Sequence, residues 1–105
     1  MNYEQKVMGI ISNGGTGRSF SMKAIAEARA GNYDTAQSLL DQANESLHCA
    51  HSIQTELIQE EARGESYPIT ILMVHAQDHL MNAMTVRDLA VEMIEIIKEN
   101  RRVKN

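Results

Sequence analysis

The chain has 105 residues, of which 43% are hydrophobic and 23% charged, and its formal net charge is −4 at pH 7. This composition is typical of a soluble globular protein and excludes a disordered or fibrous chain. A net negative charge gives no general attraction to phosphate backbones, so nucleic acid is not an expected partner. Because the length supports one modest core, we expect a single domain over residues 1–105.

The distribution of helix-breaking residues indicates an all-α fold. The chain has one proline, one phenylalanine and no tryptophan, and its six glycines lie within residues 9–17 and at positions 31 and 64. A sheet protein of this size would need more turn residues and more aromatic and β-branched residues. We therefore predict three helical segments separated by the glycines.

The first segment, before Gly31, gives two conflicting indications. Each interior glycine costs about 1 kcal/mol relative to alanine, so the run Asn-Gly-Gly-Thr-Gly at 13–17 predicts a break in the helix. The same run also belongs to a stripe of small residues at helical spacing, which would let another helix approach closely. The stripe consists of Ile10, Gly14, Gly17, Ser21, Ala24 and Ala28.

The second and third segments are predicted to form an antiparallel hairpin. The second opens after Asn32, a residue type favoured at N-caps, and closes at Gly64, which suits a left-handed stop. The third begins at Pro68, since a first helical turn does not need the missing N–H. Only a few residues separate Gly64 from Pro68, so the helices must run antiparallel. The predicted core seams are Ala36, Leu40, Ala43, Leu47, Ala50, Gln54 and Leu57, then Leu72, Ala76, His79, Ala83, Val86, Ala90, Met93 and Ile97.

The third segment carries apolar residues beyond this seam, and self-association would cover the surplus. These residues are Ile71, Met73, Leu80, Met84, Leu89, Ile94 and Ile96. We therefore expect an antiparallel three-helix bundle that assembles as a coiled-coil-like oligomer. No apolar run approaches the ~20 residues of a membrane span. With no signal peptide visible, we expect a cytoplasmic protein that does not insert into the membrane.

A polar island lies inside the third segment at residues 73–81. His75, Asp78 and His79 are three and four residues apart, so their side chains project from one sector of a helix. His75 and Asp78 belong to a second seam, whose polar middle either faces solvent or lines a shared axis. That seam consists of Ile71, His75, Asp78, Asn82, Thr85 and Leu89.

Four interpretations of the island compete. A zinc hydrolase helix would carry glutamate where this chain has Ala76. A carboxylate-bridged di-metal bundle needs two Glu-x-x-His pairs, and only Glu45 with His48 supplies one. The histidines could instead fill a wet groove, which is the default for His48 and His51. Finally, a neutral imidazole could act as a nucleophile that accepts a transferred group. Spacing alone does not decide between the last two.

Two strings of residues carry a specific resemblance. Residues 72–81 read Leu-Met-Val-His-Ala-Gln-Asp-His-Leu-Met, and residues 54–64 read Gln-Thr-Glu-Leu-Ile-Gln-Glu-Glu-Ala-Arg-Gly. Together they resemble the IIA component of the lactose/cellobiose (chitobiose) family of the bacterial phosphoenolpyruvate-dependent sugar phosphotransferase system. The likeness runs from about Val7 to Lys98 and keeps both strings in order. It implies a homotrimer of three-helix protomers in which the first helix runs through the glycines.

The resemblance also implies a function and a set of site residues. His75 matches the phosphorylated histidine, which accepts a phosphoryl group from phospho-HPr and passes it to the IIB component during uptake of a β-disaccharide. Asp78 matches an aspartate at the threefold axis, where three copies share a divalent cation, usually magnesium. Gln77 and His79 match supporting positions of the pocket. The alternative is a non-catalytic helical adaptor or metal-binding bundle, and the intact His75 with Gln77 and Asp78 favours the phosphocarrier.

Overall fold

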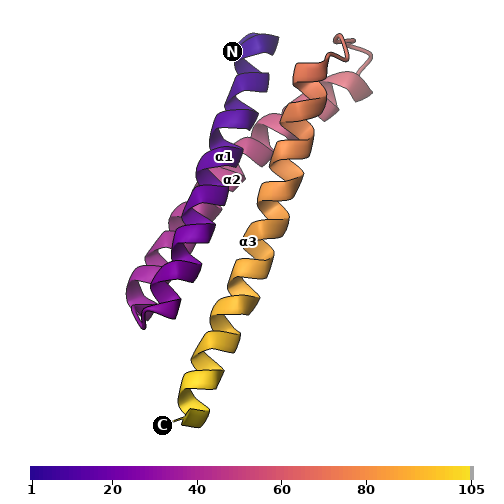
Figure 1. Cartoon of the computed structure of the whole chain (residues 1–105). Helices are drawn as coiled ribbons and strands as arrows, with labels where there is room; N and C mark the ends of the chain where they lie inside the picture. The colour runs from indigo at the N-terminus through magenta and orange to yellow at the C-terminus, as the bar shows by residue number, and fades with distance from the viewer. Residues whose placement is uncertain (105) are drawn as a thin grey trace.

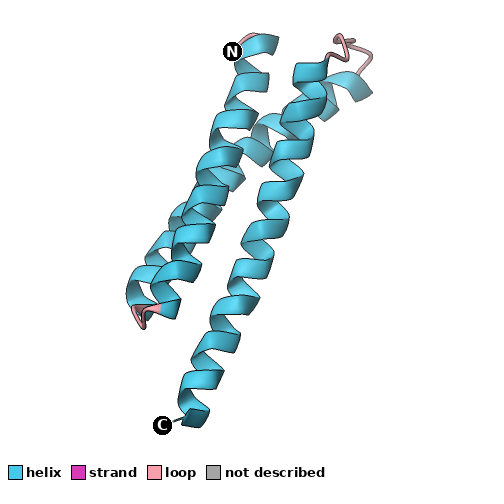
Figure 2. Cartoon of the chain, viewed as in Figure 1, coloured by secondary structure: helices cyan, strands magenta, loops and turns pink. Residues whose placement is uncertain are grey.

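The computed structural model of the protein describes residues 1–104. Its helices are α1 (Tyr3–Arg29), α2 (Tyr33–Ala62) and α3 (Ile71–Lys104), and consecutive helices run in opposite directions (Figure 1). The molecule is a rod with principal extents of 59 × 21 × 18 Å. Within residues 1–104 only helices and their connecting loops are present (Figure 2). The predicted all-α antiparallel bundle is confirmed. None of these helices combines the length and hydropathy that crossing a bilayer requires.

Helix α1 lies between the other two. It packs along both α2 and α3, whereas α2 and α3 contact each other at far fewer positions. The core consequently consists of two clusters arranged along α1. One contains Val7, Ile10, Leu47, Ala50, Ile53, Leu57, Ala76, Leu80 and Ala83, and the other contains Ala24, Ala28, Ala36, Leu40, Ala90 and Ile94.

The break predicted in the first segment does not occur, because α1 continues through residues 13–17. All six residues of the small-residue stripe are buried. The approach at Gly17 is so close that a Cβ there would lie 2.5 Å from Leu47 Cγ. Packing against α2 and α3 therefore offsets the low helix propensity of the glycines. The continuous helix implied by the family resemblance is confirmed.

Glycines end the first two helices as predicted. Gly31 and Gly64 have φ values of 88° and 96°, which only glycine adopts without strain. In each turn, a backbone N–H beyond the glycine donates to a carbonyl of the last helical turn, with Asn32 N to Glu27 O at 2.9 Å and Glu65 N to Glu60 O at 3.1 Å. Asn32 precedes α2 as expected, but its side chain bonds to Glu27 rather than capping the helix.

Helix α3 begins at Ile71, three residues later than predicted from Pro68. Thr70 caps it, since Thr70 Oγ1 accepts a hydrogen bond of 3.1 Å from the backbone N–H of Met73. Pro68 instead lies in the loop, where its carbonyl oxygen accepts a hydrogen bond of 2.7 Å from the hydroxyl of Tyr3. A side-chain cap thus sets the start of the helix, and the proline shapes the loop before it.

The predicted seam of α2 is correct in full, whereas that of α3 is correct only in part. All seven predicted α2 positions are buried. In α3 the three alanines of the seam are buried, but Leu72 and Met93 are each 46% exposed, and Leu80 and Ile94 occupy the core instead. A helix that is apolar on several faces does not indicate which of two adjacent stripes turns inward. In the structure, Leu80 packs in one core cluster with Ile10 of α1, and Ile94 packs in the other with Ala24 and Ala28.

Candidate functional site

His75 projects from the second turn of α3 and is exposed to solvent. Its ring stacks on that of His79, one turn further along, with a centroid separation of 5.6 Å and an interplanar angle of 21°. His79 is half-buried, so it lies between His75 and the body of the bundle. The structure thus brings these two predicted site residues together and leaves His75 open to an approaching molecule.

The partial burial of His79 follows from two glycines in the middle of α1. A Cβ built on Gly15 would lie 3.1 Å from His79 Nε2, and one built on Gly14 would lie 3.4 Å from His79 Cδ2. The imidazole therefore rests directly on the backbone of α1, where no side chain intervenes. The continuous α1 positions this glycine pair beside His79 of α3.

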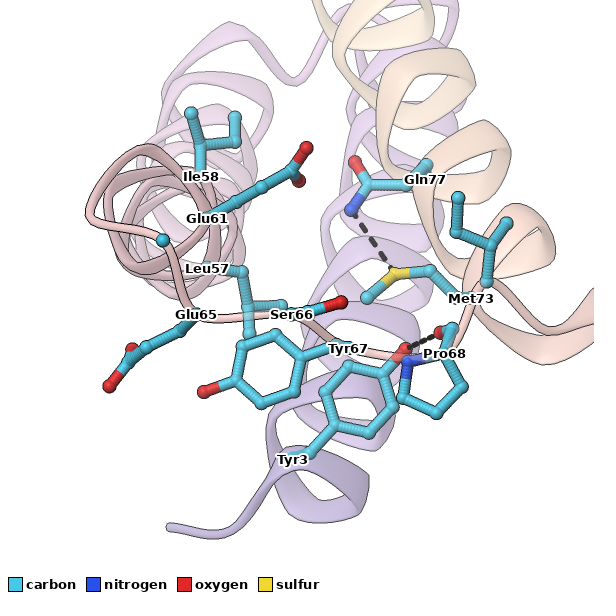
Figure 3. A pocket seen from close by; sticks show the side chains of 12 residues that line it. Tyr3, Leu57, Ile58, Glu61, Glu65, Ser66, Tyr67, Pro68, Met73 and Gln77 are labelled. Atoms are coloured by element: carbon cyan, nitrogen blue, oxygen red, sulfur yellow. Dashed lines mark hydrogen bonds between the residues drawn. The ribbon is translucent and has the colours of Figure 1, made fainter.

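Gln77 lies on the other side of α3 from His75, because residues two apart in a helix are rotated by ~200°. Its Oε1 accepts a hydrogen bond from Gln54 Nε2, and its Nε2 lies 3.5 Å from Met73 Sδ as a donor. Figure 3 shows Gln77 and Met73 at the edge of a cavity of about 550 Å³, beneath the loop between α2 and α3. Within one chain, Gln77 does not join the His75 site.

Asp78 is exposed on the same side of α3 as His75. The whole second seam, from Ile71 through Asn82 to Leu89, is exposed in the single chain and lies opposite the core-facing residues. Large apolar side chains lie on this seam and beside it, and their exposed fractions are far above those of the core. They are Ile71 at 91%, Val74 at 56%, Met81 at 52%, Leu89 at 56% and Ile96 at 54%.

A single chain does not assemble a complete metal site around Asp78. Over residues 1–104, no group of three or more histidine, cysteine, aspartate or glutamate side chains could hold a metal ion. The donor chemistry of Asp78 nevertheless fits a hard cation, since carboxylate oxygens are preferred ligands of magnesium. The carboxylate also has no ion-pair partner among the described residues that would compete for it.

A buried polar network, which the sequence analysis did not predict, supports the loop that leads into α3. Lys6 Nζ lies 2.7 Å from Glu60 Oε1 and 3.0 Å from Glu56 Oε1, and the Tyr67 hydroxyl donates to Glu60 Oε2 at 2.6 Å. Tyr67 also stacks on Tyr3, with ring centroids 4.7 Å apart (Figure 3). These contacts tie the start of α1 to the end of α2 and to the loop.

Hydrogen bonding shifts the pKa values in this network. The ammonium of Lys6 and the hydroxyl of Tyr67 both donate to Glu60 and lower the pKa of its carboxyl. Conversely, the carboxylates of Glu60 and Glu56 raise the pKa of Lys6 above its ordinary value. The side chains of Lys6 and Glu60 are only 9% and 11% exposed. This ion pair is therefore a structural link between α1 and α2.

His48 and His51 lie on α2, whereas His75 and His79 lie on α3. His48 and His51 are both exposed and line a groove of about 330 Å³ between α2 and α3, together with Asn44 and Arg87. The guanidinium of Arg87 donates to the Asn44 side chain across this groove. Cys49 is a free, exposed thiol on the same helix.

Comparison with known proteins identifies the family. The family model for the "PTS system, Lactose/Cellobiose specific IIA subunit" matches residues 5–98. The lichenan-specific phosphotransferase enzyme IIA component of Bacillus subtilis (strain 168) is 55% identical over 96 residues, which cover 91% of this chain and 87% of that protein.

Solved structures agree with this assignment. The crystal structure of the cellobiose-specific enzyme IIA from Bacillus anthracis matches with a TM-score of 0.93 and 46% identity, over 97% of this chain and 94% of the other. A solution structure of the IIA(chitobiose)–HPr complex of the Escherichia coli N,N'-diacetylchitobiose branch matches with a TM-score of 0.83 and 36% identity, over 96% and 98%.

The chain therefore belongs to the lactose/cellobiose-specific IIA family of the sugar phosphotransferase system. It is a phosphotransferase component of a sugar transport system, and the resemblance noted in the sequence is confirmed.

Proposed function

We propose that His75 accepts a phosphoryl group from phospho-HPr and then donates it to the IIB component of the same system. The observation that carries this proposal is the exposed imidazole of His75, stacked on His79 at a centroid distance of 5.6 Å. A related solved structure is a IIA(chitobiose)–HPr complex, which supports HPr as the donor. Because His75 must meet two partners in turn, its accessibility is a requirement of the mechanism.

In the first transfer, the phosphorus–nitrogen bond to the histidine of HPr breaks and a phosphorus–nitrogen bond to His75 forms. The lone pair of a neutral imidazole nitrogen of His75 attacks phosphorus, and the bonding pair returns to the donor imidazole. Exchange between two such nitrogens is nearly isoenergetic, so catalysis requires mainly alignment and stabilisation of charge. His79 supports the orientation of His75. Gln77 does not reach this site within one chain and is proposed as a supporting pocket residue of the assembled protein.

We further propose that the chain acts as a homotrimer whose protomers meet along the face of α3 that carries Val74, Asp78 and Leu89. His75 lies at the edge of this face and stays open to its partners. The exposed apolar side chains on this face of α3 support the proposal, since monomeric proteins rarely expose a large contiguous apolar surface. Convergence of three Asp78 carboxylates would create repulsion, which a divalent cation relieves by neutralising charge. Asp78 of each protomer would hold such a cation, proposed to be magnesium.

The proposed setting is the cytoplasm, where a single IIA domain over residues 1–105 exchanges phosphoryl groups with HPr and IIB. Membership of the IIA family supports this location. The phosphoryl group passes from IIB to a β-disaccharide that enters the cell through a membrane component.

Phosphorylation by a reconstituted system tests the assignment of His75. Incubation with phosphoenolpyruvate, the upstream kinase and HPr should add one acid-labile phosphate per chain, measured by intact-protein mass spectrometry. His75→Ala should abolish this labelling. His48→Ala replaces another exposed histidine outside the site and should be labelled like the wild type. Equal labelling of His75→Ala and wild type would contradict the proposal.

A further inference from the structure

We propose that Gly14 and Gly15 of α1 are positioning residues for the phosphoryl transfer. They leave a space on the backbone of α1 that holds the imidazole of His79 against that of His75. The inference rests on the proposed function of His75. It adds a role for α1, a helix that carries none of the site residues proposed above.

The close neighbours of Gly15 support this role. A Cβ at Gly15 would meet only atoms of His79, Nε2 at 3.1 Å and Cε1 at 3.9 Å. Packing between helices accounts for Gly17, whose neighbours are Leu47 and the carbonyl oxygen of Ala43. Gly15 lies outside the small-residue stripe, so the same explanation does not apply to it. Its missing side chain makes room for the His79 ring.

The contacts of Gly14 extend the same surface. A Cβ there would lie 3.4 Å from His79 Cδ2 and 3.6 Å from Leu80 Cα, which are ordinary van der Waals distances. Gly14 therefore lets the backbone of α3 approach α1 and also leaves room for the His79 ring. Of the two glycines, Gly15 is the position where a methyl group would displace His79.

A displacement of His79 would reach His75 through their stacked rings. At 3.1 Å, a methyl carbon is closer to the imidazole nitrogen than a relaxed contact allows. The half-buried ring would shift by a few tenths of an ångström or rotate towards solvent, which would remove the surface that holds His75. In-line transfer is sensitive to misplacement on this scale.

If the proposal is correct, Gly15→Ala should increase the stability of the protein and decrease its activity. Alanine favours a helix more than glycine does, and the side chain it would meet in Gly15→Ala is free to move outward. We therefore expect Gly15→Ala to raise the melting temperature while slowing phosphoryl transfer. A glycine required only for packing would instead lower the melting temperature when replaced.

The experiment compares full-length wild type with Gly15→Ala and the matched control Gly9→Ala. Gly9 lies on the same helix, and a Cβ there would meet the flexible end of Ile53, Cδ1 at 2.9 Å, instead of His79. Rapid-quench kinetics with excess phospho-HPr should show the rate constant of a single phosphoryl transfer reduced about tenfold in Gly15→Ala, with the phospho-HPr concentration that gives half of the maximal rate within about twofold of wild type. Gly9→Ala should keep the wild-type rate.

Two further measurements test whether the effect passes through His79. In the wild type, proton NMR should show a nuclear Overhauser effect between the His79 ring and the Gly15 Hα protons, and this signal should change in Gly15→Ala. In a His79→Ala background, Gly15→Ala should have no further effect on this transfer rate constant, since the two changes would act on one contact.

Three results would overturn the proposal. These are a wild-type rate in Gly15→Ala, absence of the ring-to-glycine signal in the wild type, and an equal slowing by Gly15→Ala with or without His79. The second result requires no variant and decides the matter even if Gly15→Ala does not fold. Failure of the wild type to become phosphorylated on His75 would instead reject the proposed function, whatever the NMR signal.

Discussion

Gln54 on α2 donates a hydrogen bond to Gln77 on α3, and the bond joins the two helices that contact each other least. Gln54 is 8% exposed, so its amide is shielded from water. The bond fixes the Gln77 side chain with its Nε2 directed at Met73. One hydrogen bond thus both links two helices and orients a proposed pocket residue.

Replacing Gln54 with leucine should therefore lower stability and slow phosphoryl transfer. Gln77 would lose its donor, at a cost of about 1 kcal/mol in the free energy of unfolding. Urea denaturation measures the loss, and Gln59→Leu, at an exposed position of α2, is the control. An unchanged transfer rate in Gln54→Leu would argue against a supporting role for the orientation of Gln77.

Gly17→Ala should destabilise the protein through overpacking. Its Cβ would lie 2.5 Å from Leu47 Cγ, and relieving such a clash typically costs about 1–3 kcal/mol. This exceeds the gain in helix propensity of about 1 kcal/mol. Thermal unfolding should show a lower melting temperature, and the penalty should shrink in a Leu47→Ala background. A penalty of the same size in that background would exclude Leu47 as its source.

Acidification should destabilise the protein through Glu60. Lys6 and Tyr67 hold the pKa of this carboxyl below its ordinary value of 4.5, so the folded state favours the charged form. The resulting stabilisation is complete above the unfolded-state pKa and is lost as the pH falls through the lower folded-state pKa. Urea midpoints measured from about pH 7 to about pH 3 should decline less steeply in Glu60→Gln than in wild type.

Sedimentation equilibrium tests the proposed trimer. The wild-type chain should have the mass of three protomers at micromolar concentration, because exposed side chains such as Leu89 would be covered. Leu89→Arg should dissociate the assembly by burying an unpaired charge. Met22→Arg changes a comparably exposed position on α1, 53% against 56%, and should remain trimeric. A stable wild-type monomer would contradict the proposed interface.

Asp78→Leu tests the proposed axial cation. The substitution replaces a cluster of like charges with apolar contact, a change that is often neutral or stabilising. We expect the variant to stay trimeric, to lose the sensitivity of its melting temperature to a chelator, and to be phosphorylated on His75. If a folded variant lost phosphorylation, Asp78 would belong to the catalytic pocket and the cation proposal would be withdrawn.

Much of the fold follows from local rules, and the exceptions have physical causes. The core seam of α2 and the turns at Gly31 and Gly64 were predicted correctly because periodicity and backbone conformation determine them. Helix propensity alone predicted a break in α1, since it takes no account of the tertiary packing that makes glycine favourable at Gly17. Burial of Lys6 was not predictable, because lysine is seldom buried unless it is paired with an opposite charge, and this pairing is seen only in the folded structure.

The candidate site was predictable in part. Helical spacing correctly placed His75, Asp78 and His79 on one side of α3. The same helical spacing, applied to Gln77, would have placed this residue on the other side of α3 from His75. The contact between Gly15 and His79 joins two helices that are distant in sequence. The spacing of residues within one helix therefore cannot predict it.

The central place of α1 also has a consequence for the order of folding during synthesis. Helices α1 and α2 are adjacent in sequence and can pair through local contacts before α3 has been made, since nearby contacts close at low entropic cost. This hairpin presents the rest of the α1 surface as a template for the last helix. Docking of α3 then completes the protomer. It also exposes, on the face of α3 opposite the core, His75 and the other residues of the second seam.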